Sequence, residues 1–134
     1  MSALKVLVVD DHAGFRKSLA KFLQSQRNVE VVGEAVDGAN AIAQTERLKP
    51  DLVILDLEMP DRDGFETAQV IKRQYPGTYL VLLSMHGNDI YRLKARQCMV
   101  DGFIHKTHLK EGLLMILRNR ENNMVSTAQY ASVA

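Results

Sequence analysis

Two hydrophobic patterns alternate along this chain. In one, apolar residues follow one another almost without interruption, which is typical of strands buried on both faces of a sheet. The clearest example is 52–55, which ends abruptly in the carboxylate of Asp56. The predicted strands are 4–9, 29–32, 52–56, 79–84 and 102–105.

In the other pattern, apolar residues recur every three or four positions, as on the buried face of an amphipathic helix. Phe15, Leu19 and Phe22 show this spacing after the first strand, and Pro50 and Pro76 follow two later helices as stop signals. The predicted helices lie at about 15–23, 39–48, 65–71, 88–97 and 109–117. Such strand–helix units with short crossovers predict an α/β fold: a parallel sheet with helices on both faces, wound right-handedly.

Composition narrows the class of protein. With 134 residues, 46% of them hydrophobic, the chain is long and apolar enough for one domain with a buried core. A formal net charge of +1 gives no overall attraction to nucleic acid. Because no apolar run approaches the roughly 20 residues that span a bilayer, and no basic leader is seen, we expect a cytoplasmic protein without membrane contact. The single Cys98 is expected to be a small buried hydrophobic residue.

Polar residues of complementary chemistry follow four of the predicted strands. They are Asp10 with Asp11, Asp56, Ser84 and Lys106. In an open α/β sheet the carboxyl ends of parallel strands lie at one rim, where ligands bind. Clustered carboxylates repel one another, and a hard cation such as Mg²⁺ relieves that repulsion. One carboxylate can then accept a phosphoryl group, whose oxygens a lysine and a serine can hold.

Simpler explanations exist for these residues. The aspartates and Ser84 can cap helix N-termini, worth about 1 kcal/mol each, and Lys106 can be a solvated strand end. Capping does not require a hydroxyl and an ammonium at one rim, which favours a shared site. Phe103 fits core packing as well as a functional role. His105 and His108 lie close in sequence, but without a further ligand they do not predict a transition-metal site.

Together these residues resemble the receiver domain of two-component response regulators, the CheY-like family. The resemblance covers about residues 4–118 and rests on Asp10-Asp11, Asp56 with Met59-Pro60 and Gly64, Ser84 and Lys106 at successive strand ends. It implies a flavodoxin-like, doubly wound (βα)5 fold, with a five-stranded parallel sheet in the order 2-1-3-4-5. We expect a receiver domain over 1–120 and a linker-like tail over 121–134, which is polar and small.

The resemblance also implies a role for each rim residue. Asp56 would accept a phosphoryl group from a sensor histidine kinase, and Lys106 would pair with the phosphoryl oxygens. Mg²⁺ would be bound by Asp11, with Asp10 in support, by Asp56 and by the main-chain carbonyl of Glu58. Such a domain phosphorylates and dephosphorylates itself and is not a classical enzyme.

Ser84 and Phe103 would form the switch. The resemblance implies that the Ser84 hydroxyl moves to bond the phosphoryl group and that Phe103 swings inward, so that a local charge change biases a two-state element. The readout surface would be the fourth helix, fifth strand and fifth helix.

The segment 82–86 is similar to the subgroup with a LuxR-type helix-turn-helix output. This implies control of transcription through a DNA-binding domain absent from this chain, with a homodimer as a further expected partner because such receivers often dimerise on phosphorylation. The alternative is a stand-alone receiver that acts by protein contact or in a phosphorelay.

Some positions depart from the usual pattern of the family. Lys106 is followed by Thr107 where proline is common, so we expect a trans peptide bond there. Met85 stands where a small residue often follows the switch hydroxyl, and it would narrow access to the site. The bulky segment 98–100 replaces small residues before the fifth strand, and Glu58 adds a negative charge beside the acceptor.

Two other classes of protein share part of this chemistry or fold. A haloacid-dehalogenase-like phosphatase needs an acid two residues after its nucleophile, and Glu58 has that offset, but the chain is too short for the cap domain. A flavodoxin-like nucleotide or flavin binder needs a glycine-rich phosphate loop after the first strand, and none follows Val9. The receiver interpretation explains more of the rim residues than either alternative.

Overall fold

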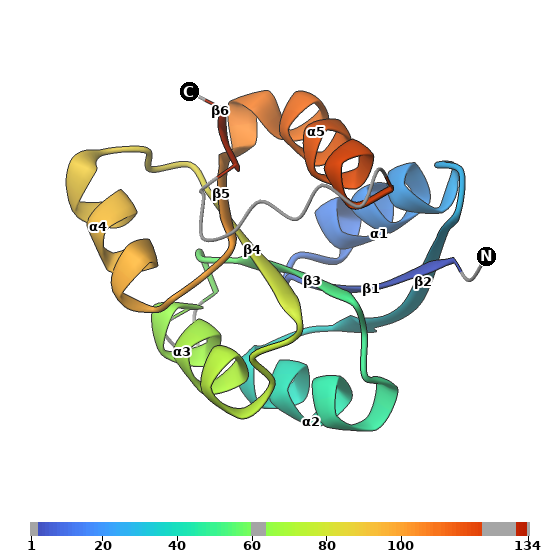
Figure 1. Ribbon diagram of the computed structural model, residues 1–134, viewed down its shortest axis with the longest axis horizontal. Helices are drawn as coiled ribbons and strands as arrows, with labels where there is room; N and C mark the ends of the chain where they lie inside the picture. Colours follow the sequence, from blue (N-terminus) through green and yellow to red (C-terminus); the bar gives the residue numbers. More distant parts are fainter. Residues whose placement is uncertain (1–2, 60–63, 122–130, 134) are drawn as a thin grey trace.

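A parallel sheet forms the centre of the computed structural model, which describes residues 3–59, 64–121 and 131–133 (Figure 1). The order across the sheet is β2-β1-β3-β4-β5-β6, and every neighbouring pair is parallel. The strands of the described residues are β1 (Leu4–Val9), β2 (Val29–Ala35), β3 (Leu52–Asp56), β4 (Tyr79–Ser84), β5 (Gly102–His105) and β6 (Ala131–Val133).

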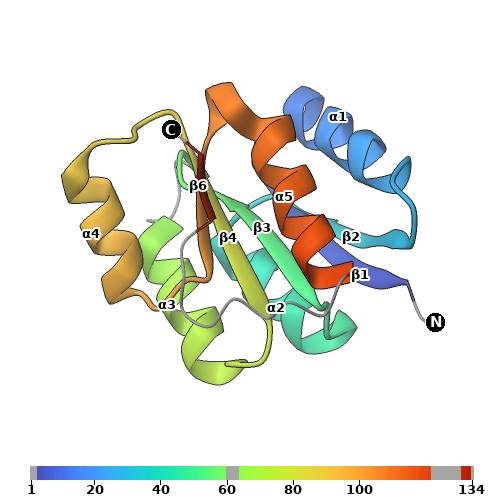
Figure 2. The ribbon, with the colours of Figure 1, turned by 45° about the horizontal axis from the view of Figure 1, so that its top comes forward.

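Helices cover both faces of this sheet (Figure 2). On one face lie α1 (Ala13–Gln24) and α5 (Leu109–Glu121), and on the other lie α2 (Gly38–Leu48), α3 (Gly64–Gln74) and α4 (Asp89–Gln97). A short 3-10 turn, Lys106–His108, joins β5 to α5. None of the helices within these ranges is long and apolar enough to cross a bilayer.

The core has two halves, one on each side of the sheet. In β3, Val53 and Leu55 pack with the side of α2, α3 and α4, whereas Leu52 and Ile54 pack with the side of α1 and α5. Because successive residues of a strand point to opposite faces, a strand buried on both faces must be apolar at every position. This is the physical reason for the unbroken apolar runs of the sequence.

The five predicted strands, their order 2-1-3-4-5 and the five helices are confirmed. Strand β2 is longer than the predicted 29–32 and continues to Ala35, because it follows β1 past a register shift between Val6 and Leu7. Its polar Glu34 is held by Arg16 at 2.9 Å, which lets a charged residue continue the strand. Cys98 is buried, as predicted, and its Sγ donates to the Phe65 carbonyl oxygen at 3.4 Å.

The sequence did not predict the sixth strand. Part of the proposed tail, Ala131–Val133, pairs in parallel with β5 from Gly102 to Ile104. The five-strand description is therefore incomplete, because β6 adds to the edge beyond β5. The rest of the tail from 122 to 130, and residue 134, lie outside the described residues.

Backbone geometry before and after β5 bears on two further expectations. No cis peptide bond occurs in the described chain, so the Lys106–Thr107 bond is trans as predicted. Met99, in the bulky segment before β5, adopts a left-handed φ of 63°, a conformation that favours glycine. Its side chain is 73% exposed, so the bulk points into solvent instead of into the core.

Candidate functional site

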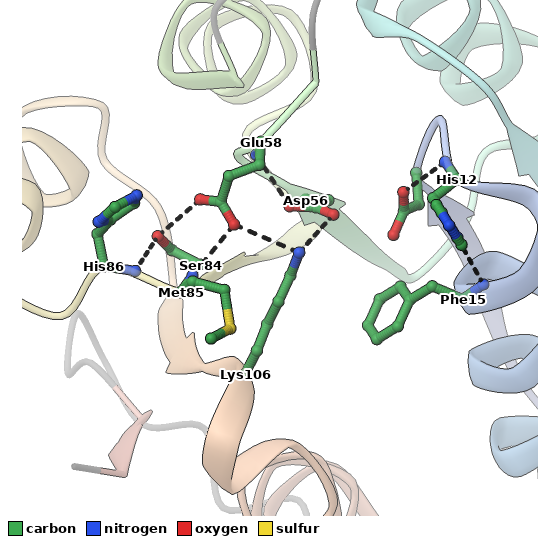
Figure 3. A network of polar contacts seen from close by, with 9 residues as sticks. His12, Phe15, Asp56, Glu58, Ser84, Met85, His86 and Lys106 are labelled. Atoms are coloured by element: carbon green, nitrogen blue, oxygen red, sulfur yellow. Dashed lines mark hydrogen bonds and ion pairs between the residues drawn. The ribbon is translucent and has the colours of Figure 1, made fainter.

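The carboxyl ends of four adjacent strands bring the predicted residues together. Asp10 follows β1, Asp56 is the last residue of β3, Ser84 is the last residue of β4, and Lys106 follows β5. The strands end at the same level because Val9 pairs with Leu55, Asp56 with Leu83, and Ser84 with His105. Figure 3 shows Lys106 turned toward Asp56, and both Lys106 and Ser84 turned toward Glu58, which lies between them.

Asp56 is the anchored carboxylate of this site. It is 3% exposed, and its Oδ1 accepts a hydrogen bond from the Glu58 backbone N–H at 2.9 Å. Its Oδ2 accepts from Lys106 Nζ at 2.7 Å. A carboxylate held by two hydrogen bonds in this way keeps a fixed direction.

Lys106 balances the charge of Asp56. Its side chain is 17% exposed, so it is not a solvated strand end. Burial by itself lowers the pKa of Lys106, but the hydrogen bond and charge of Asp56, with the charge of Glu58, outweigh burial and raise it above its ordinary value. Its ammonium also lies 5.1 Å from the centre of the Phe15 ring. The site therefore holds a fixed positive charge beside the carboxylate.

The Glu58 side chain completes a polar network around Asp56 (Figure 3). Its Oε2 accepts from Ser84 Oγ at 2.9 Å, and its Oε1 accepts from the Met85 backbone N–H at 3.1 Å. Lys106 Nζ lies 3.3 Å from Oε1. The Ser84 hydroxyl oxygen in turn accepts from the His86 backbone N–H at 2.8 Å. The Glu58 carboxylate thus binds both Ser84 and Lys106.

Asp10 is the least satisfied group of the site. It is 1% exposed, and its Oδ1 accepts from the His12 backbone N–H at 2.8 Å. Its Oδ2 is buried without a hydrogen-bond partner in the described part of the chain. Burial, joined by the neighbouring Asp56 carboxylate, raises the pKa of Asp10 to about 7 despite the His12 hydrogen bond and Lys106.

Asp10 and Asp56 fit a hard divalent cation. A buried, unpartnered carboxylate oxygen beside a second carboxylate is the arrangement that a cation would relieve, and Mg²⁺ takes one or two carboxylates together with other oxygens. Asp11, predicted as a ligand, is exposed. Across the described ranges no group of three or more His, Cys, Asp or Glu side chains is placed to hold a metal.

Helix capping does not explain Asp10, Asp11 or Ser84. The N-cap of α1 is His12, whose Nδ1 accepts from the Phe15 N–H at 3.2 Å, and the N-cap of α4 is Asn88. Asp10, Asp11 and Ser84 therefore do not serve as caps of these helices. His105 bonds Thr107 at 2.7 Å, which accounts for one histidine of the pair without a metal.

Of the two predicted switch residues, Ser84 belongs to this network and Phe103 lies in the core. Phe103 is 1% exposed, on the same side of the sheet as α2, α3 and α4, and the guanidinium of Arg92 lies 5.6 Å from its ring centre. Its ring is thus inward and packed in this structure. Met85 is 52% exposed, and the sequence argument that it narrows the site stays a prediction.

Sequence reasoning missed two contributors to the site. The sequence predicts a role for the main-chain carbonyl and the charge of Glu58, but it does not predict the side-chain contacts of Glu58 with Ser84 and Lys106. The sequence pattern predicts only that Phe15 lies on a helix face, yet Phe15 lies in the first turn of α1, and the Lys106 ammonium is 5.1 Å from its ring centre. A position in that first turn was the available signal, because the turn follows directly from a strand end.

The family model for the response regulator receiver domain matches residues 6–118. Among curated relatives, the response regulator protein VraR of Staphylococcus saprophyticus is 37% identical over 122 residues, which are 90% of this chain and 57% of the relative. VraR of Staphylococcus epidermidis is 41% identical over 105 residues, 78% of this chain and 50% of the relative. The chain thus spans about half the length of the curated relatives it matches.

Solved structures share the fold. The signal receiver domain of the putative response regulator NarL from Mycobacterium tuberculosis has a TM-score of 0.77 and 32% identity, covering 88% of this chain and 98% of that one. A structure of two RcsB dimers bound to two parallel DNAs has a TM-score of 0.81 and 26% identity, covering 91% of this chain and 62% of that one.

Proposed function

This chain belongs to the response regulator receiver domain family, and from that premise we propose that Asp56 is its phosphoacceptor. One observation carries the proposal. Asp56 is a buried carboxylate at a strand end whose oxygens are fixed by Lys106 and the Glu58 N–H, with Ser84 bonded within the same network. Lys106 supplies a point charge for phosphoryl oxygens, and Ser84 supplies a hydroxyl.

The proposed step is a phosphoryl transfer from a histidine of a sensor kinase. An Asp56 carboxylate oxygen attacks phosphorus and forms a P–O bond while the P–N bond to the kinase imidazole breaks. The bonding pair stays on the imidazole nitrogen, and Asp56 becomes an acyl phosphate. Lys106 stays beside the group throughout and offsets the negative charge that gathers on its oxygens.

Asp10 and Asp56, with the main-chain carbonyl of Glu58, are the proposed Mg²⁺ ligands, and Asp11 is proposed as a further one. When bound, Mg²⁺ would neutralise the carboxylates and the incoming phosphoryl oxygens. The unpartnered Oδ2 of Asp10 and the raised pKa of that residue support this assignment, because burial and the neighbouring Asp56 carboxylate disfavour the charged form of Asp10, and a bound cation would favour it. Because Asp11 is exposed, its carboxylate would bind the Mg²⁺ ion from the side that faces solvent.

We further propose that this receiver controls transcription in a longer protein. It matches about half of each VraR relative, and a structural relative is described as a dimer bound to DNA. A DNA-binding domain outside this chain and a homodimer formed on phosphorylation are the matching proposals. A stand-alone receiver remains the second candidate, since the site itself would work in either setting.

The acceptor assignment is tested by intact mass after incubation with acetyl phosphate and Mg²⁺. Wild type should gain one phosphoryl group, with acetate as the leaving group, and Asp56→Asn should gain none. Asp51→Asn is the matched control, because Asp51 precedes the same strand at its amino end, where it bonds the Lys5 N–H at 2.9 Å. Equal uptake by wild type and Asp56→Asn would overturn the assignment.

A further inference from the structure

Arg16 links helix α1 to the loop that carries the first two aspartates of the site. Its Nη1 donates to the main-chain carbonyl oxygen of Asp10 at 2.9 Å, and its Nε donates to Glu34 Oε1 at 2.9 Å. The Arg16 side chain is only 11% exposed, and one planar guanidinium makes both bonds. Arg16 is therefore a largely buried cation near the rim that no step of the proposed phosphoryl transfer uses.

Hydrogen bonds fix both main-chain groups of Asp10. Its N–H donates to the carbonyl oxygen of Ala35 at 3.0 Å, which extends the pairing of β1 with β2 beyond the end of β1. Its carbonyl oxygen belongs to the planar peptide group that joins Asp10 to Asp11, so the bond from Arg16 sets the orientation of that peptide group. Arg16 thereby fixes the main chain from which both carboxylates project.

We propose that Arg16 is a positioning residue for the Mg²⁺ site. This inference rests on the proposed assignment of Asp10, Asp11 and Asp56 as Mg²⁺ ligands, and it adds a residue that would not itself contact the ion. By holding the peptide group between Asp10 and Asp11, Arg16 keeps two ligands in place before the ion binds. Mg²⁺ demands nearly ideal octahedral geometry, so displacement of a ligand lowers affinity.

Glu34 makes this role compatible with a nearby cation site. An unpaired guanidinium would repel a bound Mg²⁺ ion and weaken its binding. The Glu34 carboxylate lies 2.9 Å from Arg16 Nε and 3.7 Å from Lys17 Nζ, so its charge offsets the positive charge on this side of the site. Because Arg16 donates to the neutral carbonyl of Asp10, it orients the loop without engaging the carboxylates that would attract Mg²⁺.

Positioning can be separated from charge because the two effects have opposite signs. Removing a positive charge near the site should leave Mg²⁺ binding unchanged or make it tighter, because one source of repulsion is lost. Removing the bond to the Asp10 carbonyl should make Mg²⁺ binding weaker. Arg16→Met keeps an unbranched apolar stem and removes the guanidinium, so weaker binding by this variant would report the orientation of the ligands.

Lys17→Met is the matched control. Lys17 follows Arg16 in α1 and faces the same Glu34 carboxylate, but its side chain is 69% exposed. Within the described chain it makes no hydrogen bond or ion pair with Asp10. Both variants remove one cation beside Glu34, so the bond to the Asp10 carbonyl distinguishes them. Lys17→Met should bind Mg²⁺ as tightly as wild type or slightly more tightly.

The experiment measures the dissociation constant of Mg²⁺ from amide chemical shifts of the isotope-labelled protein, without acetyl phosphate. We expect Arg16→Met to raise this constant about tenfold, as the loss of a residue that orients metal ligands does. Arg16→Lys keeps the charge but lacks the planar fork, so it should raise the constant less. In a second measurement with acetyl phosphate, the Mg²⁺ concentration for half-maximal uptake should rise in Arg16→Met by a larger factor than the maximal rate falls.

The outcomes separate this inference from the function on which it rests. An unchanged dissociation constant in Arg16→Met overturns the role of Arg16 and leaves the Mg²⁺ ligands and the acceptor assignment standing. An equal rise in Lys17→Met also overturns it, because a shared effect on Glu34 then accounts for both variants. If thermal unfolding shows that Arg16→Met is not folded, Arg16→Lys decides, and binding equal to that of wild type overturns the role. If wild type shows no Mg²⁺-dependent shift at the rim, the proposed Mg²⁺ ligands and this inference fail together.

Discussion

Among single residues, Asp10 bears the largest electrostatic cost in the site. Its carboxylate is almost completely buried, and burial together with Asp56 raises its pKa to about 7 from an ordinary value of 3.8. Between these two values the folded protein retains a proton that the unfolded chain releases. The stability that this proton provides is therefore lost as the pH rises from about 4 to about 7.

This sign gives a prediction for the free energy of unfolding. In Mg²⁺-free buffer, the contribution of Asp10 should fall by about 2 kcal/mol between pH 5 and pH 8, measured by urea denaturation. Asp10→Asn should lack this part of the pH dependence and be the more stable protein at pH 8. Adding Mg²⁺ at pH 8 should stabilise wild type more than Asp10→Asn. Parallel pH profiles for the two proteins would show that Asp10 does not carry this cost.

Lys106 supplies the positive charge that offsets the buried carboxylates of the site. Lys106→Met leaves the Asp56 carboxylate, 3% exposed, without its cation, and we expect a loss of about 2 kcal/mol in the free energy of unfolding at pH 7.5. Asp56→Asn in the Lys106→Met background is the control, because it removes the uncompensated charge. Chemical denaturation should show the double variant to be more stable than Lys106→Met; the reverse order would contradict the charge balance.

Among the secondary-structure elements, the start of α3 depends on a close backbone approach. A Cβ built on Gly64 would lie 2.9 Å from Leu57 Cα and 2.7 Å from Leu57 Cδ2. The backbone of Leu57, directly after Asp56, cannot shift without disturbing the acceptor strand. Glycine at this position is thus required by packing, since no positive φ is found at any glycine of the described chain.

Gly64→Ala should therefore destabilise the protein by about 2 kcal/mol, as overpacking against backbone does. The matched control is Gly77→Ala, because a Cβ at Gly77 meets nothing within 4 Å. Thermal and urea unfolding of both variants make the comparison. If Gly64→Ala proved as stable as Gly77→Ala, α3 could move away from Leu57 at little cost, and the rim would be less rigid than the packing indicates.

The same elements show what the sequence could and could not predict. Strands 4–9 and 52–56 were predictable because burial on both faces leaves an unbroken apolar run. Asp10, Asp56, Ser84 and Lys106 could be grouped because parallel strands end at one rim. The direction of the Glu58 side chain could not be predicted, because it depends on donors from β4 and β5. The sequence of Ala131–Val133 did not predict β6, because three residues are too few to show the hydrophobic pattern of a strand.

For the whole molecule, β6 changes the edge of the sheet next to α5. Figure 1 and Figure 2 show it beside β5, and it contacts α5 as well. An uncovered edge strand presents unpaired N–H and C=O groups that can pair with another chain. Strand β5 contains Phe103 and is followed directly by Lys106. β6 therefore covers the edge of a strand that ends at the site and belongs to the predicted readout surface.

A variant that ends at Glu121 tests whether β6 protects this edge. The β5 amides that face β6 should exchange with solvent about tenfold faster, since a backbone hydrogen bond contributes on the order of 1 kcal/mol. Amides of the central strand β3 serve as the internal control and should keep their protection. Sedimentation of the variant should also show more self-association, because the exposed edge can accept a strand. If the exchange of the β5 amides and the oligomeric state were both unchanged, β6 would contribute little to the protection of the β5 edge. The β5 part of the readout surface would then be accessible in the full chain as well.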